Sequence, residues 1–272
     1  RCSYHLRMKL LACPICNDPL TRFEGALKCR SNHSYDVARE GYVNLLPAQH
    51  RRSRQPGDNA GMVAARTRFL NKGHYVPLVE SLQNTINDAR LGGPLVDLGC
   101  GEGYFTCALA KGISDAYGVD VSKPAIKAAC KREKSISWVV GTVSRLPLVD
   151  AAFSTATVLM APLSPDVARV LLPAGKLCRV TPATNHLREL KQMMYPEVQA
   201  HDRADINLSR FDLKQSTRVT FAAALPIEDL QALVGMTPMR YRVTKSLAEA
   251  VCDAEITEVT FDFWIDLFEK QP

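Results

Sequence analysis

Short apolar runs alternate with segments of helical spacing through the middle of the chain. The runs at residues 96–98, 116–119, 136–140 and 152–159 predict strands, a helical pattern follows the first run, and another occupies residues 125–134. A turn at residues 171–176 leads into a fifth strand. Strands that alternate with helices form a parallel sheet, with the ligand at the carboxyl ends of the strands. The pattern therefore predicts an α/β, Rossmann-like domain.

Helical spacing also precedes this sheet, and two longer strands follow it. Residues 62–70 and 75–89 have helical spacing, with one apolar stripe formed by Val76, Val79, Leu82 and Ile86. Residues 217–225 predict a strand, 226–234 a helix and 255–268 a long strand. One buried face of that last strand is predicted from the alternation of Val259, Phe261, Phe263, Ile265 and Leu267.

Three alternating glycines follow the first strand. Gly99, Gly101 and Gly103 have no Cβ, so the main chain can turn sharply there and approach a ligand at the start of the next helix. A dinucleotide fingerprint requires glycine or alanine at the position that Tyr104 occupies, so the spacing argues against NAD. A plain turn from strand to helix is the alternative without a ligand.

Two acidic residues favour a different cofactor. Asp97 precedes the glycines, and Asp120 ends the second strand. This D-x-G-x-G-x-G core with a strand-end acid resembles the class I S-adenosylmethionine methyltransferases. The resemblance implies that Asp120 holds the ribose hydroxyls, that the loop from Asp97 through Glu102 to Gly103 lies beside the methionine part, and that S-adenosyl-L-methionine is the cofactor.

Length and composition indicate the size of the domains and the cellular compartment. The chain has 272 residues, 46% of them hydrophobic, which is enough for one large domain with a small appendage. No apolar run approaches the length of a bilayer span, and residues 1–9 lack the apolar core of a signal peptide. Nine cysteines without an export signal favour reduced thiols and metal ligation. We therefore expect a cytoplasmic protein with no membrane contact.

A zinc site is predicted near the N-terminus. Cys13, Cys16, Cys29 and His33 form the spacing C-x2-C-x12-C-x3-H, which supplies the four ligands of a tetrahedral zinc ion. Because all four positions are taken by protein ligands, no position remains for a catalytic water, and the zinc is predicted to be structural. Four unrelated residues would be the alternative.

Positive charge is concentrated in the same part of the chain. The net charge is +6, and residues 1–58 hold ten Lys and Arg against five Asp and Glu. The segment 48–60 is basic and has no periodicity, which predicts a linker whose Arg51, Arg52 and Arg54 contact RNA phosphates. A solvated, charged tether is the alternative.

Further segments resemble one enzyme family. They are the Cys/His pattern, residues 36–47, Arg-Arg-Ser-Arg at 51–54 with Pro-Gly-Asp at 56–58, and parts of 68–75, 121–129 and 181–191. Together they resemble the bacterial 23S rRNA (guanine-N1)-methyltransferases of the RlmA type over almost the whole chain. The chain also resembles the macrolide-resistance rRNA methyltransferases of actinomycetes, whose linker lacks the Arg-Ser-Arg and Pro-Gly-Asp run.

The resemblance implies several roles that the residues alone do not. Tyr75 and His186 would flank the cofactor, whereas by themselves they suggest a packing residue and a hydrogen-bonded surface group. The substrate would be 23S rRNA, by resemblance at guanine-745 in a hairpin near the peptide exit tunnel. A homodimer is compatible with the resemblance. The loop at residues 159–163 follows the fourth strand and is expected to face the substrate, although its side chains offer no ionisable group.

The sequence thus predicts three parts: a zinc-binding RNA-recognition domain at 1–47, a basic linker at 48–60, and a class I (Rossmann-like) methyltransferase domain at 61–272. The base that accepts the guanine N1 proton is not assigned. Two alternatives remain: a tRNA or small-molecule methyltransferase of the same fold, and a zinc-stabilised RNA-binding module without turnover.

Overall fold

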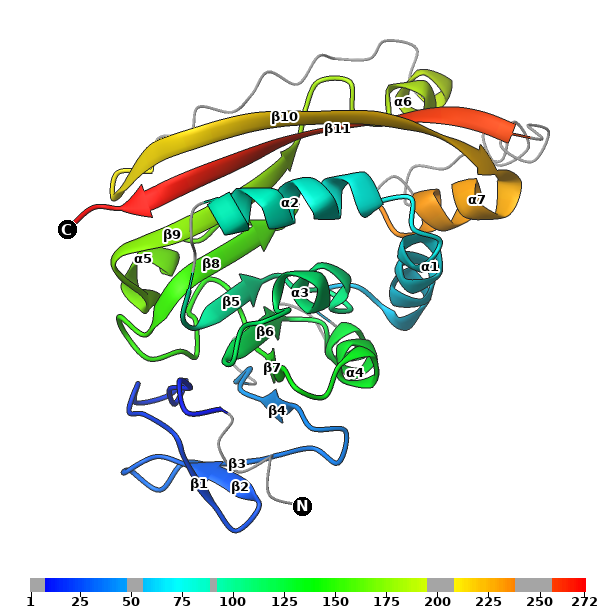
Figure 1. Cartoon of the computed structure of the whole chain (residues 1–272). Helices are drawn as coiled ribbons and strands as arrows, with labels where there is room; N and C mark the ends of the chain where they lie inside the picture. The colour runs from blue at the N-terminus through cyan, green and yellow to red at the C-terminus, as the bar shows by residue number, and fades with distance from the viewer. Residues whose placement is uncertain (1–7, 48–55, 89–91, 195–207, 238–255) are drawn as a thin grey trace.

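A computed structural model describes residues 8–47, 56–88, 92–194, 208–237 and 256–272. Its centre is an eight-stranded sheet with the order β10-β11-β9-β8-β5-β6-β7-β4 (Figure 1). The strands are β4 (Val43–Asn44), β5 (Leu95–Leu98), β6 (Ala116–Asp120), β7 (Ser137–Val140), β8 (Phe153–Leu159), β9 (Leu171–Pro182), β10 (Phe211–Pro226) and β11 (Ile256–Lys270). The strands from β4 to β9 run parallel, and β11 runs antiparallel to β9 and β10.

This order confirms the predicted Rossmann-like α/β class. The strand order reverses between β5 and β8, and in such sheets ligands bind in the crevice at that reversal, outside the carboxyl ends of the strands. The glycine turn after β5 lies at this point, so the topology brings the predicted cofactor residues to the expected edge.

One face of the sheet is covered mainly by helices. The helices are α1 (Ala60–Asn71), α2 (Val76–Asp88), α3 (Tyr104–Leu109), α4 (Lys123–Arg132), α5 (Val167–Val170), α6 (Arg188–Met194) and α7 (Ile227–Gly235). Leu78, Leu82 and Ile86 of α2 share an apolar cluster with Phe261 and Phe263 of β11. The alternating buried face predicted for the last strand is therefore confirmed. The stripe predicted for α2 is shifted, because Val76 is 43% exposed and Leu78 is buried instead.

Of the helices, α5 lies on the opposite face, where Val167 and Val170 join the second apolar cluster. The rest of that face is covered by the N-terminal unit, residues 8–42, which contains β1 (Thr21–Phe23), β2 (Ala26–Lys28) and β3 (Ser34–Asp36). Its Leu11, Leu20 and Leu27 are buried in one cluster with Val96 of β5 and Val119 of β6. The connection from β7 to β8, residues 141–152, contains no helix. The N-terminal unit therefore occupies a place that crossover helices fill in a doubly wound sheet.

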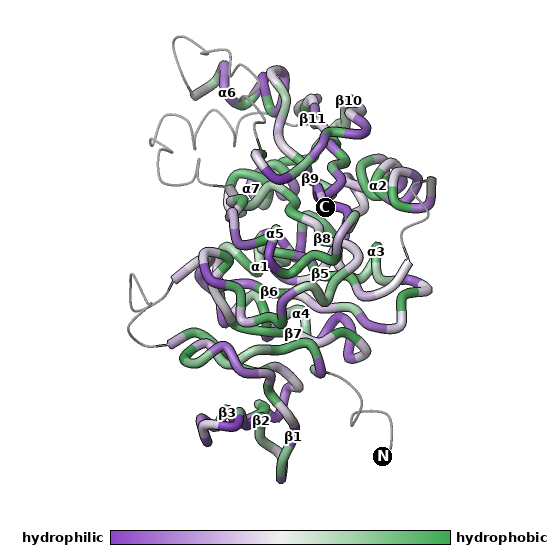
Figure 2. Tube along the Cα trace, turned by 90° about the vertical axis from the view of Figure 1, so that its left-hand side faces the viewer, coloured by the Kyte–Doolittle hydropathy of each residue, from purple (hydrophilic) through white to green (hydrophobic). Residues whose placement is uncertain are grey.

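Main-chain hydrogen bonds fix this contact. Ala12 N donates to Pro147 O over 3.0 Å, and Val149 N donates to Leu10 O over 3.0 Å. Leu10 N also donates to the Tyr117 hydroxyl over 3.3 Å. The sheet of β1–β3 lies at the end of the molecule away from α6 and the antiparallel pair of β10 and β11, as Figures 1 and 2 show.

Beyond this unit, the chain enters the large sheet earlier than the predicted boundary at residue 47. β4 pairs in parallel with β7, with Val43 opposite Val139 and Asn44 opposite Val140. The last residues of the predicted small domain thus complete the edge of the large sheet. No helix among the described residues has the length and apolar content that a membrane crossing requires.

Candidate cofactor site and metal centre

The turn after β5 depends on glycine at three consecutive odd positions. Gly99, Gly101 and Gly103 have φ angles of 77°, 56° and 83°, a region that side chains disfavour. A Cβ at Gly99 would lie 2.4 Å from the Cβ of Ala161, and one at Gly103 would lie 2.8 Å from the Trp138 ring. Gly103 thus lets α3 pack against β7, while Gly99 lets the turn meet the loop that follows β8.

Asp97 lies behind this turn and supports it. Its carboxylate is 1% exposed and accepts hydrogen bonds from Thr106 Oγ1 of α3 at 2.5 Å and from Thr157 Oγ1 of β8 at 2.7 Å. Burial raises the pKa of Asp97 to about 6, although the two hydroxyls act in the opposite direction. Its structural role is to tie together three elements, β5, α3 and β8.

Asp120 lies at the carboxyl end of β6, beside the glycine turn. Its Oδ2 accepts a hydrogen bond from Gly101 N at 2.9 Å, and its Oδ1 accepts one from Ser122 N at 2.7 Å. Each carboxylate oxygen has a second lone pair, so both can still accept a hydroxyl. Burial raises the pKa of Asp120 and the two backbone amides act against this rise. The arrangement fits a ligand with two adjacent hydroxyls, such as a ribose.

Glu102 points away from this edge. Its side chain is 2% exposed and pairs with Arg132 of α4, whose Nε lies 2.9 Å from Oε2. Burial raises the pKa of Glu102, whereas Arg132 acts to lower it. The pair anchors the glycine turn to α4, and the cofactor contact predicted for the Glu102 side chain remains a prediction.

Residues 56–59 and α1 cross the same edge, which the sequence did not indicate. Gly57 has a φ of 76°, and a Cβ there would lie 2.8 Å from Val121 Cγ1. Ser122 Oγ donates to Asp58 O over 2.6 Å, and Arg66 Nη2 lies 2.8 Å from Asp58 Oδ2. A Cβ on Gly101 would lie 3.3 Å from Arg66 Nη1, so this guanidinium covers the turn.

Tyr75 and His186 share one aromatic cluster. Tyr75 is 3% exposed and packs on Phe261 and Phe263 at centroid distances of 5.2 and 5.7 Å. His186 lies 4.4 Å from the Phe263 ring, and burial lowers its pKa to about 3. Because the ring is then neutral, its Nδ1 accepts a hydrogen bond from Asp262 N, 3.3 Å away. The structure brings these two residues together, and their contact with the cofactor stays a prediction.

The four predicted zinc ligands converge in the N-terminal unit. Their ligand atoms all lie within 4.8 Å of one another. Cys16 Sγ is 3.6 Å from Cys29 Sγ, and His33 Nδ1 is 3.3 Å from Cys29 Sγ and 3.5 Å from Cys13 Sγ. Two thiolates, each ~2.3 Å from a tetrahedral zinc, are ~3.8 Å apart, so the set has the right size.

Local backbone geometry and an outer hydrogen bond support this set. Asn17 and Asn32 have φ angles of 62° and 63°, and their amides donate to Cys13 O and Cys29 O over 2.9 and 3.0 Å. Asparagine tolerates this left-handed conformation, which explains each turn after a cysteine. The Tyr35 hydroxyl lies 3.1 Å from Cys13 Sγ and can orient that ligand. Four protein ligands make this a closed, structural zinc centre.

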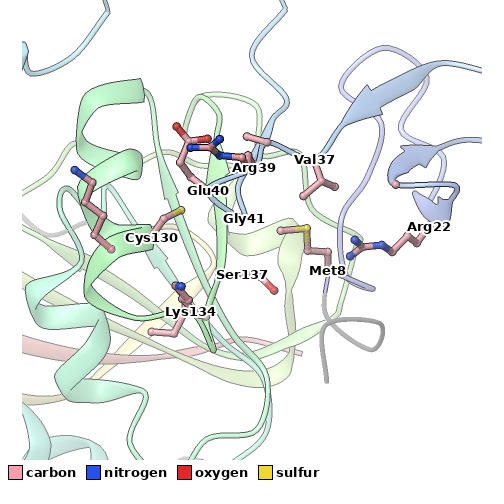
Figure 3. Close-up of a pocket in the computed structure, with 13 residues that line it drawn as sticks. Met8, Arg22, Val37, Arg39, Glu40, Gly41, Cys130, Lys134 and Ser137 are labelled. Carbon is pink, nitrogen blue, oxygen red and sulfur yellow. The ribbon is translucent and has the colours of Figure 1, made fainter. Parts of the chain in front are cut away.

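The predicted RNA contacts Arg51, Arg52 and Arg54 lie outside the described residues. The described residues form a cavity of about 530 Å³ between the N-terminal unit and the large domain. Figure 3 shows Arg22 and Arg39 of the N-terminal unit and Lys134 and Ser137 of the large domain, all of which line it. Lys131 also lines the cavity. The acidic residue of the lining, Glu40, pairs with Lys127 at 3.0 Å.

The loop after β8 contacts the glycine turn, and its predicted orientation towards the substrate stays a prediction. Met160 is 38% exposed with a φ of 54°, a strained conformation for this side chain. Ala161 is the residue that meets Gly99. The strain shows that the loop is held tightly against the glycine turn.

Sequence reasoning missed Asp58 and Arg66, since neither lies in a glycine-loop or strand-end motif. The signal available was their position: Asp58 belongs to the Pro-Gly-Asp segment, and Arg66 lies eight residues later on a predicted helix. Only the contact across the sheet edge shows that they meet.

A Rossmann-like sheet with a D-x-G-x-G-x-G turn and a strand-end acid defines an S-adenosylmethionine-dependent methyltransferase, here joined to a zinc ribbon. The family model for the RlmA N-terminal zinc ribbon matches residues 11–54, and a methyltransferase domain model matches residues 95–179. The chain is 40% identical over 190 residues to a 23S rRNA (guanine(748)-N(1))-methyltransferase from Streptomyces fradiae, covering 67% of each chain. The protein therefore belongs to the family of 23S rRNA (guanine-N1)-methyltransferases with an RlmA-type ribbon.

A second relative and a solved structure are also similar to this chain. The chain is 26% identical over 273 residues to YxjB of Bacillus subtilis, named a putative 23S rRNA (guanine-N(1)-)-methyltransferase, and the match covers 93% of this chain and 94% of YxjB. The crystal structure of the YcgJ protein from Bacillus subtilis matches with a TM-score of 0.50 at 16% identity, covering 71% of this chain and 99% of that one. The latter supports the fold alone.

Proposed function

We propose that this enzyme methylates N1 of a single guanine in 23S rRNA, at position 748 or its close neighbour 745. The sequence resemblance pointed to 745, whereas the Streptomyces fradiae relative is named for position 748. One observation supports the proposal most directly. The glycine turn with Asp120 and the Cys3His ribbon lie against the same large sheet. Because its substrate is ribosomal RNA, the enzyme acts in the cytoplasm.

The residues of the chain have separable roles in this reaction. Bound S-adenosylmethionine supplies an activated methyl group. Asp120 accepts the ribose hydroxyls, and the amino-acid part lies along the turn that Gly99 and Gly101 form. The Met160 loop, pressed against the turn, borders the space where the target guanine enters. None of the described residues is assigned as the base for the N1 proton.

The substrate has to expose the edge that reacts. Guanine N1 lies on the Watson–Crick edge, which a duplex hides, so the target base is unpaired or extruded when it is methylated. Phosphates of the flanking strand can bind in the cavity lined by Lys131, Lys134, Arg22 and Arg39. The basic residues of segment 51–54 are further candidates for phosphate contacts. A homodimer stays a prediction.

The test is to map N1-methylguanosine in 23S rRNA from cells with and without the gene. N1 methylation blocks Watson–Crick pairing, so reverse transcriptase stops beside the modified base. We expect one stop that disappears without the gene and returns with the parent chain but not with Asp120→Ala. No change in 23S rRNA, with a new methylated site in tRNA, would instead support the alternative substrate. A stop restored by Asp120→Ala would contradict the cofactor role of that residue.

A further inference from the structure

One cation lies on the ligand side of the glycine turn, and the proposed function gives it no role. Arg66 of α1 places Nη1 so close to Gly101 that a Cβ there would be 3.3 Å away. Arg132, the other arginine at the turn, is bound to the buried Glu102 behind it. Among the described residues at this edge, Arg66 is thus the guanidinium that faces the cofactor site.

The guanidinium is held in a defined position. Its Nη2 donates to Met236 O over 3.0 Å and lies 2.8 Å from Asp58 Oδ2. Both contacts use Nη2, whereas Nη1 is the nitrogen directed at Gly101. The side chain is still 30% exposed, so a ligand can reach it.

The positive charge of Arg66 influences the pKa of three of the predicted cofactor residues. Burial raises the pKa of Asp120, Glu102 and Tyr75, and in each case the charge of Arg66 acts in the opposite direction. One positive charge therefore reaches the ribose acid, the glycine turn and the predicted flanking aromatic residue at once. A ligand lying along the turn passes within range of it.

S-adenosylmethionine carries one anionic group, the α-carboxylate of its methionine part. With the ribose on Asp120, that part extends along the glycine turn, where Asp58 and Asp120 would repel a carboxylate unless a cation faced it. The two N–H groups of Arg66 Nη1 are the donors left on the side of the turn, and a charged donor of this kind forms strong hydrogen bonds to a carboxylate. We propose that Arg66 binds the α-carboxylate of S-adenosylmethionine, with Asp58 holding the guanidinium in place. This inference rests on the proposed function, since it requires that cofactor at this edge.

The test compares two ligands that differ only in this group. S-adenosylmethionine and decarboxylated S-adenosylmethionine are titrated calorimetrically into the full zinc-loaded chain. The parent protein is expected to bind the carboxylated ligand about 10- to 100-fold more tightly, the range for a hydrogen-bonded charge. Equal affinities for the two ligands would overturn the inference without any variant.

Variants then locate the effect. Arg66→Gln should remove most of the preference for S-adenosylmethionine while leaving decarboxylated ligand affinity within about twofold. Arg66→Lys keeps the charge but cannot bind Asp58 and a ligand through separate nitrogens, so the preference should be intermediate. Arg68→Gln is the matched control, because Arg68 is an exposed residue of the same helix, and it should behave as the parent.

Each alternative gives a different pattern. If Arg66→Gln weakens the binding of both ligands equally, Arg66 serves only to hold α1 against the end of α7, and the inference is wrong. If the parent binds neither ligand, the cofactor assignment itself fails, which separates that failure from this one. Thermal unfolding of each variant, measured beside the titrations, identifies a chain that has not folded.

Discussion

Single residues at the cofactor edge are determined by neighbours distant in sequence. The spacing predicted Gly99 as a ligand contact. The structure adds a second reason for glycine there, because the methyl group of Ala161, in the loop after β8, leaves no room for a Cβ. Glu102 was grouped with the cofactor residues from the same spacing, yet its side chain turns back to Arg132. A motif gives the backbone path, whereas side-chain direction depends on what packs behind it.

We expect Gly99→Ala to abolish cofactor binding and to destabilise the fold well beyond the ~1–2 kcal/mol cost of a left-handed side chain. Gly112→Ala is the control, since its φ is 81° and a Cβ there meets nothing within 4 Å. Ala161→Gly should restore binding to Gly99→Ala by removing the clash. Calorimetry and urea unfolding measure both effects, and failure of the double variant to recover would contradict a steric cause.

Asp97 predicts a pH dependence of stability. Its pKa in the folded chain is about 6, above the ordinary aspartate value of 3.8, so between these values only the folded state keeps the proton. Stability should therefore fall as pH rises from about 4 to 6, by up to ~3 kcal/mol, and then level off. Asp97→Asn should lack this fall relative to the parent in urea unfolding.

Asp166 provides the control for that experiment. Its pKa is lowered, since the bonds from Arg169 and Leu146 outweigh the effect of burial. Asp166 is thus ionised in both states above pH 4, so the difference between the parent and Asp166→Asn should stay constant from pH 5 to 6. An equal slope for both variants would show that another group titrates.

At the scale of elements, the apolar pattern predicted the parallel strands and their helices well, because each pattern reflects burial within one segment. The contact between the N-terminal unit and β5–β7 could not be predicted, since Leu11, Leu20 and Leu27 look like the core of a small ribbon. The entry of β4 into the large sheet was missed for the same reason: two paired residues are too short a pattern. The boundary at residue 47 therefore stays a prediction.

Because of this contact, we expect the loss of zinc to affect the large sheet as well as the ribbon. Cys16→Ser should release the metal and also loosen β5–β7, because the unit covers their apolar face and bonds to residues 147–149. Cys107→Ser, outside the cluster, should keep one zinc per chain. Metal analysis and hydrogen exchange of residues 116–140 test this. Unchanged exchange there, with the ribbon unfolded, would show an independent domain.

At the scale of the whole molecule, we expect RNA binding and cofactor binding to depend on separate groups of charged residues. Replacing Arg51, Arg52 and Arg54 by Gln should weaken 23S rRNA binding and reduce its salt slope by roughly 0.7–0.9 per lost phosphate contact. Affinity for S-adenosylmethionine should not change. Filter binding across a salt series measures the slope.

The matched control replaces three exposed cations at the other end of the sheet, Arg188, Arg210 and Lys214. That triple variant should keep the slope of the parent. If the two triple variants give the same slope, the segment 51–54 is a solvated tether. The methylated guanine should be the same in all variants, because base contacts, not phosphate contacts, carry sequence information.

The use of an N-terminal ribbon in place of a crossover helix also affects how the chain matures on the ribosome. Leu27 is made roughly 120 residues before Leu148, its partner in the same cluster. At about 5–20 residues per second, the ribbon waits on the order of 10 s for the sheet that will cover it. During that interval zinc can already close the ribbon, but its apolar face stays open to water. The nascent chain thus exposes an apolar surface that the finished enzyme buries against β5 and β6.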